Sequence, residues 1–195
     1  MPLGKVENSK VLHKQYYVFR DQCIRLVNYI NTYEALFDSD TSNLAILQDT
    51  AELFFYDINE LLIDRIWLEV YKVTENSTEN KNLSTVYFVD QILKIHGLET
   101  ERFKTIRGLS DKLRKTSKKL KPARNQYLTH LDKALATDKQ LIKKLSKEEF
   151  YVFRENINEF TDQVAAAIGL APLDYRVQTG EGDVHTLLEK LGEIR

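Results

Sequence analysis

The chain has 195 residues, of which 43% are hydrophobic and 10% aromatic, so it can build a packed core and is not disordered by composition. Its formal net charge is -1, so any attraction to a polyanion must come from a local surface patch. With only 7 Gly and 3 Pro, long stretches lack helix-breaking residues, which predicts one compact all-α domain.

The first two predicted helices carry the strongest apolar periodicity. Apolar residues recur at three- and four-residue intervals over 10–37, and this spacing predicts a first helix. Ser42 or Asn43 can cap a second helix that runs to about Val73. Because the second segment is the most apolar of the chain, we expect it to be the spine of the core.

The third predicted helix covers residues 83–97 and ends at Gly97. His96 lies in its last turn, where the helix dipole favours a cation, so we expect it to have a capping role. His13 and His185 lie in the first turns of their predicted helices, and we expect both side chains to face solvent.

The next helices are delimited by a proline and a glycine. A fourth helix is expected from near Glu99 to Pro122, which removes a backbone donor and disfavours the α conformation at the residue before it. Proline is favoured in the first turn of a helix, so a new helix is expected from Pro122 to Ala136. A further helix spans 147–169 and stops at Gly169.

The C-terminal part is expected to be an appendage. An irregular segment follows the bundle, and Asp183 can cap a short last helix. This pattern predicts a helical bundle over residues 1–170 and a C-terminal tail with a short helix over residues 171–195.

The cysteine content and the hydropathy of the sequence indicate the cellular compartment of the protein. Cys23 is the single cysteine and has apolar neighbours at helical spacing, so we expect a buried, inert thiol without a disulfide. There is neither an apolar signal segment nor a run of 18 apolar residues, and we therefore expect a cytoplasmic protein that makes no membrane contact. The four histidines are far apart in sequence, and we expect no metal site and no cofactor.

Charge is distributed unevenly along the chain. Residues 101–124 hold ten cations against two acids, a net charge of about +8. The candidates for contacts with RNA phosphates are Lys112, Lys115, Lys118, Lys119 and Lys121. The alternative is that this run is only the solvated face of a helix, and the sequence leaves both interpretations open.

The basic run leads directly to an arginine and a histidine. In KPARNQYLTHLDK, Arg124 is followed by Asn125 and, six positions after the arginine, by His130. An arginine can bind a phosphate through a forked pair of hydrogen bonds, and an imidazole can transfer protons near neutral pH. The patterns GxxxxGK[ST], GxGxxG and HExxH are absent from the sequence, which argues against a glycine loop for nucleotides and a zinc peptidase site.

The segment RNQYLTH is similar to the R-x4-6-H signature of the HEPN (higher eukaryotes and prokaryotes nucleotide-binding) superfamily, whose pattern includes a polar residue after the arginine. The chain resembles the abortive-infection AbiU-like branch in its helix order, in the position of the motif and in the THLDK that contains its histidine. The resemblance implies a HEPN-like antiparallel helical bundle. It also implies a metal-independent endoribonuclease of a toxin–antitoxin or phage-defence system, with RNA as substrate, a homodimer and an antitoxin protein as potential partner.

The resemblance assigns a role to each motif residue. His130 would transfer protons, Arg124 would bind the phosphate, and Asn125 would orient the substrate or hold the histidine tautomer. At about 100° per residue, Arg124 and His130 are about 240° apart around an ideal helix, so they would not share one face. Two motifs facing each other across a two-fold axis would supply both groups to one cleft, which predicts a homodimer with a composite site.

Two other interpretations stay open. A HEPN-like bundle could bind RNA or a protein partner without cutting, and an unrelated bundle could carry Arg124 and His130 as ordinary surface residues. In some HEPN toxins a tyrosine follows the histidine by two positions and is modified by a partner nucleotidyltransferase. That position here is Asp132, so we do not expect neutralisation by that route.

Overall fold

A computed structural model describes residues 3–38, 41–75, 82–98, 100–123, 146–176 and 180–193, and its account of side chains excludes residues 3–8 and 121–123. Within these ranges every regular element is an α-helix, which confirms the predicted all-α class. The helices are α1 (Leu3–Phe37), α2 (Thr41–Thr74), α3 (Thr85–His96), α4 (Glu101–Ala123), α6 (Lys147–Ala167) and α7 (Val184–Glu193).

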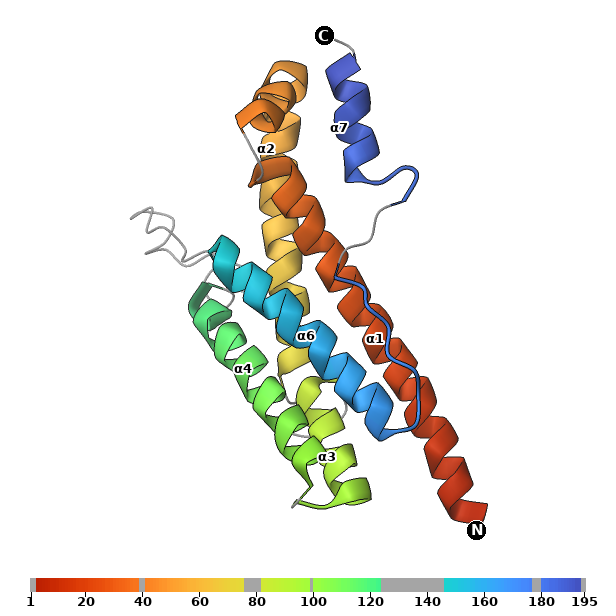
Figure 1. Cartoon of the computed structure of the whole chain (residues 1–195). Helices are drawn as coiled ribbons and strands as arrows, with labels where there is room; N and C mark the ends of the chain where they lie inside the picture. The colour runs from red at the N-terminus through yellow and green to blue at the C-terminus, as the bar shows by residue number, and fades with distance from the viewer. Residues whose placement is uncertain are drawn as a thin grey trace.

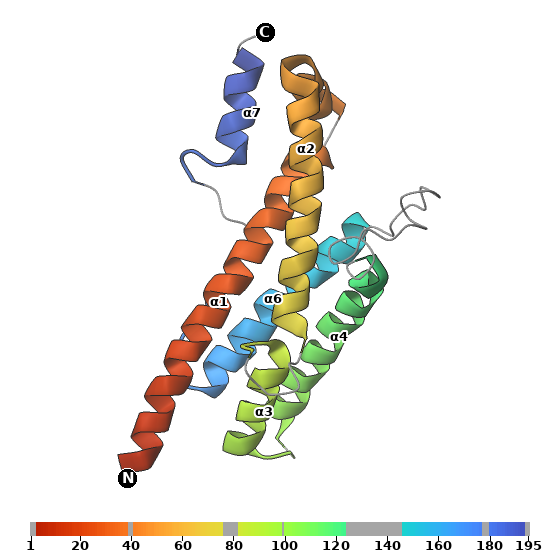
Figure 2. The ribbon, with the colours of Figure 1, turned by 180° about the vertical axis from the view of Figure 1, so that it is seen from behind.

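The helices form an elongated antiparallel bundle in two layers. The long helices α1 and α2 pack against each other, and α4 packs against α6, α3 and α2 (Figure 1). Helix α6 lies in front of α2 in this view and behind it when the molecule is turned round (Figure 2). The first part of α2 and the end of α1 project beyond this bundle, and α7 stands beside them.

The hydrophobic interior consists of a main core in the bundle and a smaller cluster at its projecting end. The main core joins α1, α2, α3, α4 and α6, and its fully buried aromatic side chains include Tyr16, Phe19, Phe88 and Phe160. Tyr175, from the segment after α6, is also completely buried in this core. A smaller cluster at the projecting end consists of Ala35, Leu36, Leu47, Phe55 and Leu188. Helix α7 therefore packs on α1 and α2 rather than on α4.

Capping residues fix several helix ends where the sequence predicts them. Gly97 follows α3 with a φ of 77°, a conformation that favours glycine, and its N–H donates to Leu93 O at 2.9 Å. Ser146 and Glu149 form a capping box at the start of α6, which satisfies two of its unpaired N–H groups. Asp183 caps α7 by accepting hydrogen bonds from the N–H groups of His185 and Thr186. The predicted ends at Gly97 and Asp183 are confirmed.

The sequence mispredicts the start of one helix, the continuity of a second and the end of a third. Helix α1 begins at Leu3 rather than at residue 10. Helix α2 contains a kink at Ala51, whose φ of -165° and ψ of 74° are not helical. Helix α4 passes through Pro122 and ends at Ala123. A proline near the end of a helix removes only one intrahelical hydrogen bond, and we infer that the packing of the preceding turns offsets this loss. The remainder of the helix predicted to start at Pro122 lies outside the described residues.

Two histidines from other helices form hydrogen bonds to the C-terminal end of α6. The ring of His13 donates from Nε2 to Ile168 O at 2.9 Å, so this half-buried side chain does not face solvent as predicted. His96 donates from Nε2 to Ala167 O at 2.8 Å and therefore caps α6 rather than its own helix. Carbonyls at a helix C-terminus lack intrahelical donors, which explains why rings from α1 and α3 bind there. His185 is exposed, as expected.

Cys23 is fully buried in the main core, as the sequence predicts. Burial raises the pKa of its thiol far above the usual range, because a thiolate is poorly solvated there. The thiol is therefore not a reactive nucleophile. As a separate finding, the described helices include none that is both long enough and apolar enough to cross a lipid bilayer.

Candidate nucleic-acid interface

Helix α4 has one apolar face and one cationic face. Its buried side chains recur at three- and four-residue intervals against the rest of the bundle: Phe103, Ile106, Leu109, Ser110, Leu113, Ser117 and Leu120. Ser110 Oγ donates to Thr85 Oγ1 of α3 at 3.0 Å, so this buried hydroxyl is satisfied. The apolar face fixes the rotation of α4, and its other face must point to solvent.

The exposed face is where most of the basic run lies. Lys104, Arg107, Lys112, Lys115, Lys118 and Lys119 are all exposed. At about 100° per residue, four of the lysines, Lys104, Lys112, Lys115 and Lys119, fall within about 40° of one line along the helix. With a rise of about 1.5 Å per residue, this lysine stripe is about 22 Å long. Four of the five predicted RNA-binding lysines are therefore exposed on one element, while the side chain of Lys121 lies outside the described part.

Acids engage both ends of the lysine stripe. Lys104 Nζ lies 3.0 Å from Glu101 Oε1, and Lys119 Nζ pairs with Glu149 of α6. Among the described residues, Lys112 and Lys115 have no ion-pair partner. Exposed ion pairs contribute only about 0–1 kcal/mol, so a phosphate can replace these carboxylates. The middle of the stripe is thus the part most available to an anion.

A glycine stands at the centre of the lysine stripe. Gly108 is exposed, and a Cβ built on it would meet no atom within 4 Å. Its φ is not positive, unlike that of Gly97 and Gly169. Glycine inside a helix costs about 0.5–1 kcal/mol relative to alanine. Nothing in the described part of the chain requires a glycine at this position.

The residues of the Arg–His motif, Arg124, Asn125 and His130, lie outside the described residues. Arg124 directly follows Ala123, the last residue of α4. The Lys119–Glu149 ion pair joins the end of α4 to the start of α6. The motif therefore belongs to a segment whose two flanking helices meet at one end of the bundle, the end to which the lysine stripe leads.

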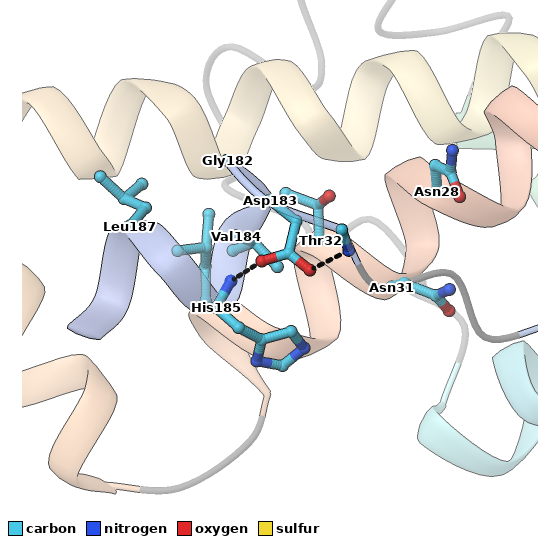
Figure 3. Close-up of a pocket in the computed structure, with 10 residues that line it drawn as sticks. Asn28, Asn31, Thr32, Gly182, Asp183, Val184, His185 and Leu187 are labelled. Atoms are coloured by element: carbon cyan, nitrogen blue, oxygen red, sulfur yellow. Dashed lines mark hydrogen bonds between the residues drawn. The ribbon is translucent and has the colours of Figure 1, made fainter. Parts of the chain in front are cut away.

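A hollow between α1 and α7 has a different character (Figure 3). Asn28, Asn31 and Thr32 line it from α1, and Asp183 lies at the start of α7. The backbone N–H groups of Thr186 and Gly180 lower the pKa of the Asp183 carboxyl, so that carboxylate stays charged and engaged in capping. A fixed negative charge disfavours a phosphate, and this hollow does not suit a nucleic acid.

The buried carboxylate of Glu69 has a structural explanation. Its Oε1 lies 2.7 Å from Arg65 Nη2 and 3.2 Å from Lys72 Nζ, and Gln22 of α1 donates to its other oxygen. All these partners satisfy a charge that would otherwise be costly to bury. Among the described residues, no three His, Cys, Asp or Glu side chains are grouped in a way that could hold a metal ion.

The comparison with protein families gives one result that spans most of the chain. The family model described as AbiU2, a HEPN family, matches residues 9–187. The chain belongs to the AbiU2 family of HEPN proteins. The resemblance seen in the sequence is therefore confirmed, and the match runs from within α1 to the first turn of α7. No curated protein and no solved structure matches the chain.

The AbiU2 match covers the basic helix and the motif alike. The candidate interface also includes residues that the sequence does not single out. Lys104 and Arg107 are exposed on the same helix as the predicted lysines, although the sequence predicts no specific contact for them. The position of Gly108 between the lysines was also missed. A projection of residues 101–123 at 100° per residue was the signal that could have found both.

Proposed function

We propose that this AbiU2-family protein is a metal-independent endoribonuclease of a toxin or phage-defence system in the cytoplasm. Arg124, Asn125 and His130 from two subunits of a homodimer would form the cutting site. The observation that carries the proposal is that α4, which bears the lysine stripe, ends at the residue before Arg124 in a chain matched by a HEPN family model. The bundle is the module expected of a HEPN protein in abortive infection.

The proposed reaction needs no metal. The 2′-hydroxyl of RNA loses its proton and attacks the adjacent phosphorus, while the bond from phosphorus to the 5′-oxygen breaks and that oxygen gains a proton. The products are a 2′,3′-cyclic phosphate and a free 5′-hydroxyl. His130 transfers the protons, Arg124 stabilises the charge on the phosphorane, and Asn125 orients the substrate or the imidazole.

The exposed lysines of α4 supply docking in this proposal. Lys112, Lys115 and Lys118 are exposed and attract the RNA backbone, and each contact to a phosphate releases counterions. Aromatic side chains that could stack on bases are absent from the exposed face of α4 over residues 101–120. Binding through the backbone alone carries no base readout, so we expect docking to be insensitive to sequence. An antitoxin protein would act by covering this face or the motif.

Cleavage of a labelled RNA by the purified protein in excess chelator tests the proposal. We expect cutting in wild type, and a loss of at least about 100-fold in Arg124→Ala and His130→Ala, because each removes a group that acts in the transition state. Circular dichroism and the unfolding midpoint control for loss of fold. Cleavage that stops with chelator, or that survives both substitutions, contradicts the proposal.

A second function, RNA binding without cutting, is favoured by one observation, the exposed lysines that have no ion-pair partner among the described residues. In that case RNA binding is salt-sensitive, survives His130→Ala and is lost when the lysines around Lys118 are replaced. The two functions thus differ in the cleavage of RNA by wild type, and they share the interface on α4.

A further inference from the structure

Gly108 is an unexplained choice of residue in a long helix. It lies well inside α4, where glycine is a poor helix former, and its backbone does not need the conformational freedom of glycine. It does not serve close packing either, because the space where its Cβ would lie is empty to 4 Å. The position is therefore open to solvent, and a molecule that binds this face can come close to the helix backbone there.

The surroundings of Gly108 are cationic. Lys104 lies one turn before it and Lys112 one turn after it, while Lys115 lies about 20° to one side at the next turn. Asp111 lies about 60° away around the helix, and Glu101, two turns before Gly108 and about 20° from its line, pairs with Lys104. The four lysines outnumber these two acids, so the face around Gly108 keeps a net positive charge. Long flexible lysines on both sides of a bare backbone can converge on one phosphate group.

We propose that a single strand of RNA runs along the lysine stripe and approaches α4 most closely at Gly108, where the absent side chain lets the strand lie against the helix backbone. This inference rests on the proposed function, because it places the substrate that the Arg–His motif would cut. The shorter separation strengthens the attraction between the lysines and the phosphates. The position thus acts in binding rather than in the chemical step.

The chemistry of the face favours RNA over a protein partner. Over residues 101–120 of α4, no large hydrophobic side chain is exposed. Protein interfaces need such side chains at their centre, together with few lysines. A polyanion needs neither, and its affinity comes from cations and close approach.

The test replaces Gly108 by alanine and by leucine in the full chain. The probe is a labelled 2′-O-methyl oligouridine, which lacks the nucleophilic hydroxyl and cannot be cut, and its affinity is measured by fluorescence anisotropy. We expect Gly108→Ala to raise the melting temperature by about 2–4 °C. We expect Gly108→Leu to weaken binding at least about tenfold, since its side chain blocks the approach. Gly192 in α7 is the control, because it is also exposed and lies away from the lysine stripe. A Cβ there would lie 3.9 Å from Ile46 Cδ1, an ordinary van der Waals distance, so Gly192→Leu adds the same bulk beside α2.

The outcomes separate this inference from the proposed function. Loss of binding in Gly108→Leu but not in Gly192→Leu, with both folded, supports it. Wild-type binding by Gly108→Leu overturns it. If replacement of Lys112, Lys115 and Lys118 by glutamate still abolishes binding, α4 remains the RNA-binding face although the close approach at Gly108 is wrong. If that triple variant also binds normally, the docking face fails as well. A Gly108→Leu protein that binds RNA normally but changes oligomeric state in sedimentation assigns the position to a protein contact and overturns the inference.

Discussion

Two helices of this bundle expose faces of opposite charge to solvent. Helix α4 buries its apolar side chains and exposes lysines. The first part of α2, residues 41–64, has no Lys or Arg and contains five acids, Asp49, Glu52, Asp57, Glu60 and Asp64. It also exposes Leu53, Phe54, Tyr56 and Leu61, with exposed fractions of 59–81%. The net charge of -1 thus conceals two regions of opposite sign, and a polyanion responds only to the local one.

The largest expected effect tests the difference in burial. Leu113 of α4 is 1% exposed, whereas Leu53 of α2 is 81% exposed. We expect Leu113→Ala to lower the free energy of unfolding by about 2–5 kcal/mol, because it leaves a cavity in the core. Leu53→Ala should change it by less than about 0.5 kcal/mol. Urea denaturation measures both, and equal losses would mean that the face of α2 is covered in solution.

The next effect tests the difference in charge. We expect the triple replacement of Lys112, Lys115 and Lys118 by glutamate to weaken RNA binding at least about 100-fold at moderate salt, and to reduce the slope of log affinity against log salt by about 2. The matched control replaces the exposed Lys10, Lys14 and Lys190 by glutamate, which changes the net charge equally on α1 and α7. If both triple variants lose the same affinity, binding follows net charge and the exposed lysines of α4 have no special role.

The smallest expected effect concerns an acidic residue in the first part of α2. Partial burial, with the nearby charge of Glu60, raises the pKa of Asp64, so its ionised form is less favourable in the folded state than in the unfolded chain. This cost is present above the folded pKa and disappears as the pH falls through it. We expect Asp64→Asn to stabilise the fold at pH 7 by less than about 1 kcal/mol, since water screens the half-exposed carboxylate. Thermal melts should show the gain shrinking towards pH 4, and an unchanged difference would contradict the assigned cause.

The sequence predicts a structural feature correctly where that feature depends on neighbouring residues alone. Gly97 and Asp183 were predicted as helix ends because a positive φ and a side-chain cap are properties of one or two residues. The helix end predicted at Pro122 was wrong, because the free-energy cost of a proline in a helix depends on how many hydrogen bonds remain beyond it. His13 and His96 were misplaced since their carbonyl partners come from another helix.

The candidate site divides in the same way. The lysines could be predicted from the sequence, because a charged run on a helix with one apolar face must point to solvent. The residues Arg124, Asn125 and His130 stay a prediction from their motif. That Lys119 pairs with Glu149 could not be read from the sequence, since the two residues are 30 positions apart and meet only through the packing of α4 on α6.

The sequence by itself determined the helical class, the family and the sign of the charge along α4, because composition, motif and periodicity are local properties of the chain. Only the tertiary structure decided which face of α4 is free and which rings cap α6. It also showed that no group of the described part packs on Gly108. These features depend on which helices pack side by side, and contacts between residues distant in sequence set that packing.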